Sequence, residues 1–343
     1  MPSNRTATSR NPKSKISSIR TSMAIERLYL GLDVGRTIRG AVLGEDGTIL
    51  AQRRVVAEVR NPRVFIDQLI EITNDLKSSS EANGSVIGAG IGWAGLVDQR
   101  AQRIEVTPNL VDLSRFDLLA ELKEATGLKV IFDNDANVAA YGEWRRGAAR
   151  GVDDVFYITV GTGIGSGLIL GGHLQRGCRG FAGEFGHYKL DLEGLECACG
   201  GTGCLETLAS GPNIVRRVRE RLFSDPAFSI SRLASDMEGT LTAERVVQAA
   251  MEEDDLALSV LSETGRFLGL AVASVINLLN VEVVVFGGGV MAAGELILGP
   301  IRDEVRNSAI APAFECCRIL AAELGQDAGI IGAALLARDA FAE

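Results

Sequence analysis

Residues 183–206 constrain most strongly how this chain can fold, because they place possible metal ligands in a segment broken by glycines. Cys197, Cys199 and Cys204 follow a Cys-x-Cys-x4-Cys spacing, and His187 precedes the first of them by ten residues. Three thiolates and one imidazole match the number and softness of ligands that a structural tetrahedral Zn2+ takes. The stretch therefore predicts a closed zinc site. A disulfide pair or ordinary buried thiols remain open as alternatives, although cysteine clusters in proteins that are not secreted more often bind metal.

Length and composition favour a two-domain α/β protein. The chain has 343 residues, 40 of them glycine, and few aromatic residues. Many glycines with few aromatic residues fit an α/β protein whose tight turns approach ligands. The net charge of −9 argues against nucleic-acid binding, and no apolar run approaches the length of a membrane span. We therefore expect a cytoplasmic protein that binds neither nucleic acid nor a membrane.

Residues 1–25 differ in composition from the rest of the chain. They are rich in Ser, Arg, Lys, Asn and Thr and contain no acidic residue. Such a composition predicts a disordered basic tail, and a transit peptide is the alternative. The tail is too short for a helix-turn-helix domain.

The first apolar strand, expected over residues 28–34, ends in the run Asp33-Val-Gly-Arg-Thr37. The backbone N–H groups and the hydroxyl of such a corner can bind a phosphate, and Asp33 can bind Mg2+ or its water. The alternative is that this run is an ordinary turn that binds no ligand.

A second polar run, Asp-Asn-Asp-Ala-Asn at residues 133–137, lies between a strand expected over 129–132 and a helix expected over 138–147. Ligands of open α/β sheets bind where a strand ends and a helix begins. Asp and Asn are also the preferred helix N-caps, but a cap requires one such residue and four are present here. The pattern therefore favours a functional role for Asp135.

Two glycine runs follow later strands. Residues 161–167, Gly-Thr-Gly-Ile-Gly-Ser-Gly, predict a hairpin turn before a strand resumes over 168–170, with Thr162 and backbone N–H groups facing a phosphate. A helix does not follow directly, so this is not a Rossmann fingerprint. Residues 287–289 are three glycines after a β-branched strand, and they would let a helix N-terminus approach an anionic ligand.

Together these motifs indicate nucleotide-dependent phosphoryl transfer, which needs positioning, charge neutralisation and a base for the attacking hydroxyl. From about residue 30 to residue 338 the chain resembles the ROK family of sugar kinases, open reading frames and repressors. The resemblance rests on Asn-Asp-Ala-Asn, Gly-Thr-Gly-Ile-Gly-Ser-Gly, Gly-Glu-Phe-Gly-His, Cys-Ala-Cys-Gly-Gly-Thr-Gly-Cys-Leu-Glu and Phe-Gly-Gly-Gly, in the family's order and at similar spacings.

The resemblance implies an α/β fold of the two-domain actin-like ATPase (ribonuclease H-like) type, with a cleft between the domains. The smaller domain would comprise residues 26–135 plus 327–343, because the closing helix returns to it. The larger domain would comprise residues 136–326 and carry the zinc site. We also expect a homo-oligomer, a dimer or a tetramer.

Residue by residue, the resemblance implies that Asp135 is the catalytic base for a sugar hydroxyl. The sugar would be bound by Gly95, Asn109, Asn134, Asp135, Glu184, His187 and Glu206, with His187 also a zinc ligand. The nucleotide and its Mg2+ would be bound by Asp33, Gly35, Thr37, Thr162, Gly163, Gly288 and Gly289.

The expected activity is ATP-dependent phosphorylation of an aldohexose, most plausibly glucose at its 6-hydroxyl, with ATP, Mg2+ and a structural Zn2+. An N-acetylhexosamine kinase, for N-acetylglucosamine or N-acetylmannosamine, is the alternative enzyme. One position departs from the family's Asp-x-Gly-Gly-Thr, since Arg36 replaces the second glycine. A sugar-sensing protein without turnover is therefore the alternative from another class, although Asp135 and residues 161–163 favour an enzyme.

Overall fold

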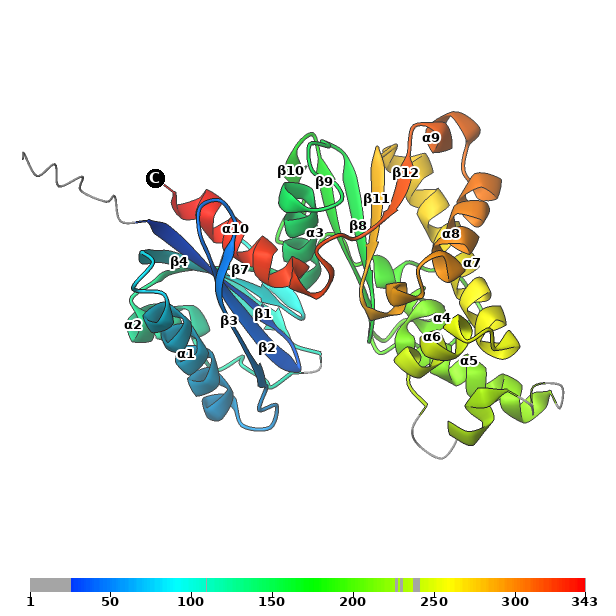
Figure 1. The fold of residues 1–343 in the computed structure, drawn as a ribbon, viewed down its shortest axis with the longest axis horizontal. Helices are drawn as coiled ribbons and strands as arrows, with labels where there is room; N and C mark the ends of the chain where they lie inside the picture. Colours follow the sequence, from blue (N-terminus) through cyan, green and yellow to red (C-terminus); the bar gives the residue numbers. More distant parts are fainter. Residues whose placement is uncertain (1–25, 109, 226–227, 229–230, 237–240, 343) are drawn as a thin grey trace, which may run out of the picture.

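Two five-stranded mixed sheets form the framework of the chain in the computed structural model (Figure 1). The structure describes residues 26–108, 110–225, 228, 231–236 and 241–342. The predicted basic tail, residues 1–25, lies outside the described residues.

The two sheets repeat one strand topology. In each sheet, the three strands that come first in the sequence pair antiparallel with one another. The two later strands then pair parallel, one beside the first strand and the other beyond it. The first sheet, in spatial order, contains β3 (Ile49–Val56), β2 (Thr37–Leu43), β1 (Arg27–Val34), β4 (Ser85–Trp93) and β7 (Lys129–Asn134). The second contains β10 (His173–Leu174), β9 (Ile164–Leu170), β8 (Val155–Val160), β11 (Val283–Gly287) and β12 (Arg318–Ala321). A separate hairpin pairs β5 (Leu96–Asp98) with β6 (Arg103–Val106).

Helices cover both faces of the sheets. The α-helices are α1 (Pro62–Ser79), α2 (Leu118–Thr126), α3 (Asp135–Arg146), α4 (Glu206–Ala209), α5 (Gly211–Ser224), α6 (Ala243–Met251), α7 (Asp255–Leu279), α8 (Glu295–Ser308), α9 (Ala311–Glu315) and α10 (Ala328–Phe341). Short 3-10 helices are η1 (Phe185–His187), η3 (Arg232–Asp236), η4 (Gly289–Ala293) and η5 (Gly325–Asp327). Their ends follow local chemistry: Asn61 caps α1 by accepting from two backbone N–H groups, and Gly127 ends α2 in the left-handed conformation.

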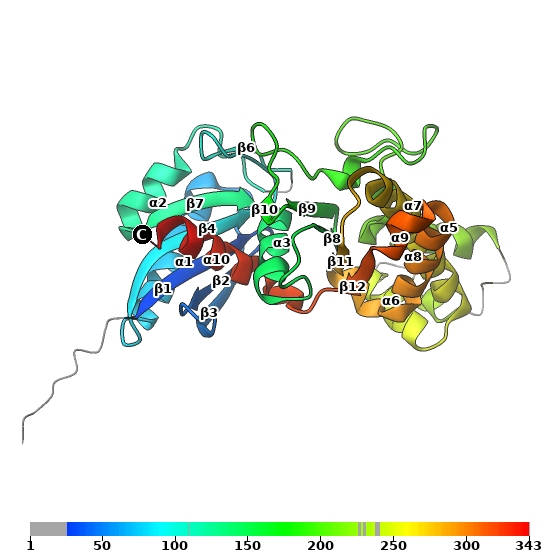
Figure 2. The same ribbon diagram turned by 90° about the horizontal axis from the view of Figure 1, so that it is seen from above.

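The helices and sheets form five layers, in the order α1 and α2, first sheet, α3 and α10, second sheet, and α5 to α8. Figures 1 and 2 show this arrangement from two directions. Side chains along each strand alternate between the layers on its two faces. On β1, Leu28 and Leu30 point into a core shared with α1 and α2, whereas Tyr29 packs with α10. On β8, Phe156 points into the core with α5 to α8, whereas Tyr157 packs with α3. Helices α3 and α10 thus form the middle layer, with one sheet on each side.

The contact between α3 and α10 depends on glycine. A Cβ added to Gly332 of α10 would lie 1.6 Å from the backbone oxygen of Val138 on α3, and one added to Gly142 would lie 2.5 Å from the oxygen of Ala328. The last helix of the chain therefore lies directly against the helix that begins at Asp135. The division into residues 26–135 plus 327–343 and residues 136–326 stays a prediction.

Helix α7 is long and apolar enough to cross a membrane by length and composition alone. However, 61% of its most apolar window is buried, and Leu261, Leu268 and Val272 lie in the core of the second sheet. The expectation that no apolar stretch reaches the length of a membrane span therefore needs correction, and the burial of α7 is that of a core helix.

Two local expectations need correction. The strand after the glycine run begins at Ile164, not at Leu168, because the turn closes within three residues when the Gly161 N–H donates to the Gly163 oxygen. The three glycines run from the last residue of β11, Gly287, to the first residue of the 3-10 helix η4, Gly289. The α-helix α8 begins only at Glu295.

Replacing Gly332 with alanine should lower the free energy of unfolding by about 1–3 kcal/mol, because the added methyl group forces α10 away from α3. Gly299 in α8 is the matched control, since its added Cβ would meet nothing within 4 Å. Denaturant unfolding should show a change within about 1 kcal/mol for Gly299→Ala. Equal effects at the two positions would contradict the close packing of α3 on α10.

Candidate active site

The junction between β7 and α3 carries the central part of the site. Asn134 caps α3, because its Oδ1 accepts from the N–H groups of Ala136 and Asn137 at 2.9 and 3.1 Å. Its Nδ2 donates to the Gly95 oxygen at 3.1 Å. Gly95 has a φ of 149°, and a Cβ there would lie 2.1 Å from the Val106 oxygen. Asn134 and Gly95, both predicted at the sugar site, are therefore in contact.

Asp133, the residue before Asn134, holds this junction in place from the protein interior. Its side chain is fully buried, and its Oδ1 accepts from the backbone N–H of Asn134 and from Nδ2 of Asn137. Its Oδ2 pairs with Nε of Arg176 at 2.6 Å. Arg176 lies eight residues before Glu184, so this ion pair connects the junction to the segment that leads into the predicted zinc and sugar residues.

Asp135 is the first residue of α3 and is only partly exposed. Loss of hydration raises the pKa of its carboxyl group to about 7, and the negative charges of Asp33 and Glu184 add to this rise. The backbone N–H of Ala136 donates to the carboxylate and opposes the rise. Asp135 is thus a carboxyl group that can gain and lose a proton near neutral pH.

Asp33 lies at the end of β1, where it pairs with Arg39 on β2. The two residues stand directly opposite each other in the β1–β2 register, and the Arg39 guanidinium also donates to the Gln326 oxygen. Burial raises the pKa of Asp33, and Arg39 partly offsets this rise. One carboxylate oxygen, Oδ1, has no hydrogen bond within the described part of the chain.

Glu184, His187 and Glu206 form the other part of the site. Nε2 of His187 lies 3.9 Å from Oε2 of Glu184. Burial raises the pKa of Glu184; His187 opposes this rise and the charge of Glu206 adds to it. Glu206 accepts from the N–H of Ile164 at 2.8 Å, so its carboxylate joins these residues to the turn between β8 and β9.

The four predicted metal ligands converge. The ligand atoms of His187, Cys197, Cys199 and Cys204 all lie within 4.8 Å of one another. Nδ1 of His187 lies 3.6 Å from Sγ of Cys197, and Sγ of Cys199 lies 3.6 Å from Sγ of Cys204. The sulfurs are too far apart for a disulfide, and their separation suits thiolates around one tetrahedral zinc. His187 would therefore use Nδ1 for the metal and direct Nε2 toward Glu184.

The other three cysteines do not join this cluster. Cys178, Cys316 and Cys317 are free thiols, and burial raises the pKa of Cys317 to about 11. They lie outside the predicted metal site.

The glycine turns expected at the nucleotide lie at related places in the two sheets. Gly35 is in the turn between β1 and β2, and Thr37 is the first residue of β2. Thr162 and Gly163 are in the equivalent turn between β8 and β9. A Cβ on Gly163 would lie 2.5 Å from the Glu206 carboxylate. A side chain at residue 163 would therefore displace the Glu206 carboxylate, which accepts from the N–H of Ile164.

Gly288 and Gly289 are exposed at the end of β11, next to β8 in the second sheet. Gly288 has a φ of 92°, and a Cβ there would lie 2.3 Å from the Val160 oxygen. Gly289 has open space around it. The backbone can therefore be approached closely at this point.

Arg36, which departs from the family pattern, is among the described residues. Arg36 is exposed, and its side chain makes no hydrogen bond or ion pair with the described residues. A Cβ at the neighbouring Gly35 would approach nothing closer than 3.9 Å, so the turn is not crowded. Asn109 lies outside the described residues.

Sequence reasoning missed Arg39 and Arg176, the partners of Asp33 and Asp133. Arg39 could have been found from the hairpin register, because it lies opposite Asp33 across β1 and β2. Arg176 carries no local signal, since its partner is 43 residues away in the chain.

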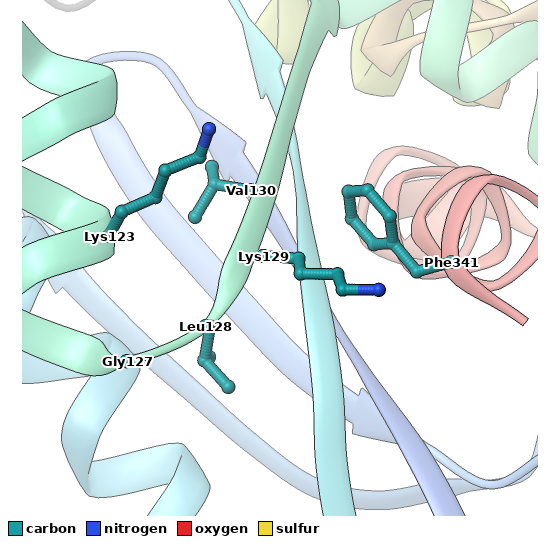
Figure 3. A pocket seen from close by; sticks show the side chains of 6 residues that line it. All are labelled: Lys123, Gly127, Leu128, Lys129, Val130 and Phe341. Carbon is teal, nitrogen blue, oxygen red and sulfur yellow. The ribbon is translucent and has the colours of Figure 1, made fainter.

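Two hollows of the described chain lie away from these residues. One of about 420 Å³ lies at the start of β7, at the opposite end of that strand from Asp135. Figure 3 shows its side chains, with Lys123 and Phe341 on either side of β7. The other, of about 350 Å³, is lined by residues including Arg103, Leu113 and Phe132. Neither contains the predicted site residues.

Comparison with known proteins decides the family. A sequence profile described as the ROK family matches residues 29–340. The chain belongs to the ROK family. A glucokinase from Halalkalibacterium halodurans is 37% identical over 317 residues, which cover 91% of this chain and 96% of that protein. A xylose repressor from Bacillus subtilis is 29% identical, over 91% of this chain and 77% of the repressor.

A solved structure confirms the fold of this ROK chain. The ROK glucokinase of Streptomyces griseus, in complex with glucose and AMPPNP, matches with a TM-score of 0.79 and 36% identity. The match covers 91% of this chain and 99% of that one. The actin-like ATPase fold predicted from the sequence is therefore confirmed, as is the ROK family itself.

Changing Cys199 to serine should remove zinc from the protein, because the site loses one of three thiolates. Metal analysis of the purified protein should find about one zinc per chain in the wild type and much less in Cys199→Ser. Cys316→Ser is the control, since Cys316 is exposed and outside the cluster. Unchanged zinc in the Cys199 variant would refute a closed four-ligand site.

Proposed function

We propose that this ROK protein is an ATP-dependent hexose kinase that transfers a phosphoryl group to the 6-hydroxyl of glucose, with Asp135 as general base. The observation that carries this proposal is the position of Asp135 at the junction of β7 and α3, with a pKa raised to about 7. A general base works best when its pKa lies near the operating pH.

In the proposed reaction, the Asp135 carboxylate accepts the proton of the sugar hydroxyl as that oxygen attacks the terminal phosphorus of ATP. The bond from this phosphorus to the bridging oxygen breaks, and ADP leaves with the bonding electrons. The ion pair between buried Asp133 and partly exposed Arg176 anchors this junction. Phosphoryl transfer needs little covalent chemistry from the protein beyond such positioning.

The proposed sugar site consists of side chains that suit hydroxyl groups. Carboxylates accept, and amides and imidazoles both donate and accept. The contact of Asn134 with Gly95 and the approach of His187 to Glu184 support the assignment. The full proposed set is Gly95, Asn109, Asn134, Asp135, Glu184, His187 and Glu206.

The proposed nucleotide site uses the two equivalent turns and the end of β11. Thr162 is exposed on its turn, and Gly288 and Gly289 leave the backbone open. Asp33 fits Mg2+ chemically, because it offers a hard oxygen and its Oδ1 has no hydrogen bond within the described residues. Bound magnesium would neutralise phosphate charge. The full proposed set is Asp33, Gly35, Thr37, Thr162, Gly163, Gly288 and Gly289.

Glucose is favoured as the substrate by two relatives: the Halalkalibacterium halodurans glucokinase and the Streptomyces griseus glucokinase, whose structure contains glucose. An N-acetylhexosamine is the alternative substrate, since the proposed contacts serve hydroxyls that both sugars carry. We further propose that two α/β domains enclose the substrates and that the protein is a homo-oligomer. Exposed Leu270 and Leu278 on α7 support a subunit contact.

A sugar sensor without turnover is the second candidate function. It is favoured by Arg36, which stands where the family has glycine, and by the similarity to a xylose repressor. The Arg36 side chain is unpaired within the described chain and adjoins the proposed phosphate turn.

The deciding experiment measures ADP release from Mg-ATP with glucose, mannose, fructose, N-acetylglucosamine and N-acetylmannosamine, and sugar binding by calorimetry in parallel. Release with glucose is the expected result. Release only with an N-acetylated sugar would support the alternative substrate. Sugar binding without ADP release would support the sensor.

Replacing Asp135 with asparagine should leave glucose affinity nearly unchanged and lower kcat by about a hundredfold or more, because the amide cannot accept the proton. Asp75→Asn is the control, since Asp75 lies on the exposed face of α1 and pairs with Arg53. Steady-state kinetics and calorimetry give the two quantities. A normal kcat in Asp135→Asn would exclude this residue as the base.

The pH profile should report the same group. Asp135 must be ionised to accept a proton, so kcat should rise as pH increases through about 7 and then level off. Glu184→Gln removes a negative charge that raises this pKa, so the midpoint should move to lower pH. Profiles of kcat at saturating sugar would test this. A midpoint near the ordinary carboxyl value, or a shift to higher pH, would contradict the assignment.

A further inference from the structure

Lys189 is fixed opposite one of the metal ligands by the backbone. The N–H of Leu190 donates to the Gly203 oxygen at 2.9 Å, and the N–H of Leu205 donates to the Tyr188 oxygen at 2.8 Å. These bonds form an antiparallel bridge in which Lys189 stands directly opposite Cys204. Directly opposed residues project to the same face, so the Lys189 side chain extends along Cys204.

The ammonium group reaches the sulfur. Nζ of Lys189 donates to Sγ of Cys204 at 2.8 Å. A Cβ on Gly201 would lie 2.4 Å from this Nζ, so the loop leaves room for the ammonium group because residue 201 has no side chain. Cys204 is fully buried, whereas Cys199 is exposed. Lys189 therefore contacts a ligand that water does not reach.

The charges of the cluster favour such a contact. Three thiolates and one neutral imidazole around Zn2+ leave one excess negative charge. The sulfur of Cys204 lies in the protein interior, where an uncompensated charge is costly. An ammonium group that donates to the thiolate supplies the opposite charge and a charge-assisted hydrogen bond.

We propose that Lys189 retains the zinc ion: its ammonium group donates to the Cys204 thiolate, balances the charge of the site and slows release of the metal. The inference rests on the cluster of His187, Cys197, Cys199 and Cys204 holding zinc, and it is independent of the kinase activity. It assigns a role to a residue that is not itself a metal ligand.

The test compares zinc retention in Lys189→Met, Lys189→Arg and Lys189→Glu with that of the wild type. Zinc Kd would be measured by competition with a chromogenic chelator, and the release rate in excess chelator. We expect Kd to rise on the order of 10–100-fold in Lys189→Met, as for other groups that support metal ligands. Lys189→Glu should lose zinc more readily still, and Lys189→Arg should remain near the wild type because it keeps a cationic donor.

Lys123→Met is the matched control, because Lys123 lies on α2, in the hollow at the start of β7. It should retain zinc like the wild type. Circular dichroism of the zinc-loaded proteins separates metal loss from misfolding. If Lys189→Met does not fold, the zinc Kd of Lys189→Arg is compared with that of Lys189→Glu instead. Equal zinc Kd and release rate in the wild type, Lys189→Met and Lys189→Glu would overturn the proposal. So would a wild-type protein without zinc.

Discussion

The close packing of α3 on α10 determines where the functional groups of this protein lie. Both helices stand between the two sheets, and their glycines let the backbones meet. Because α3 begins at Asp135, the same contact that joins the sheets fixes the first turn of α3. The buried Asp133 carboxylate then holds the preceding strand end through Arg176 and Asn137. Packing and site geometry therefore share one structural element.

The repeated sheet topology accounts for the pair of proposed phosphate turns. In each sheet, the first antiparallel hairpin ends in a short polar turn, and the parallel strands end beside it. At the second turn Gly163 lies against the Glu206 carboxylate, and at the end of β11 Gly288 lies against the Val160 oxygen. The first turn is less crowded and carries Arg36 instead of glycine. The two turns are thus equivalent in fold but not in chemistry.

Local patterns allowed much of the site to be predicted from the sequence. The zinc ligands share one short segment, and the Asp-Asn-Asp-Ala-Asn run marks a strand end followed by a helix. The resemblance to the ROK family supplied the fold. The ion pairs of Asp33 and Asp133 were not predicted, because Arg39 requires the hairpin register and Arg176 requires the tertiary fold. Asn109 stays a prediction, since it lies outside the described residues, and the roles of the individual site residues stay proposals.

Acidic groups concentrate around Asp135, where Asp33 and Glu184 both raise its pKa. This arrangement suits a base that accepts and releases a proton near neutral pH. The central claim of the proposed function is that the protein transfers a phosphoryl group from ATP to the 6-hydroxyl of glucose. Phosphorus NMR of the protein mixed with glucose and Mg-ATP tests that claim directly. The account predicts a new phosphate monoester resonance coupled to the two protons of the glucose 6-carbon, growing as the ADP resonances grow. Bound glucose with an unchanged ATP spectrum would contradict it and indicate a sugar-sensing protein.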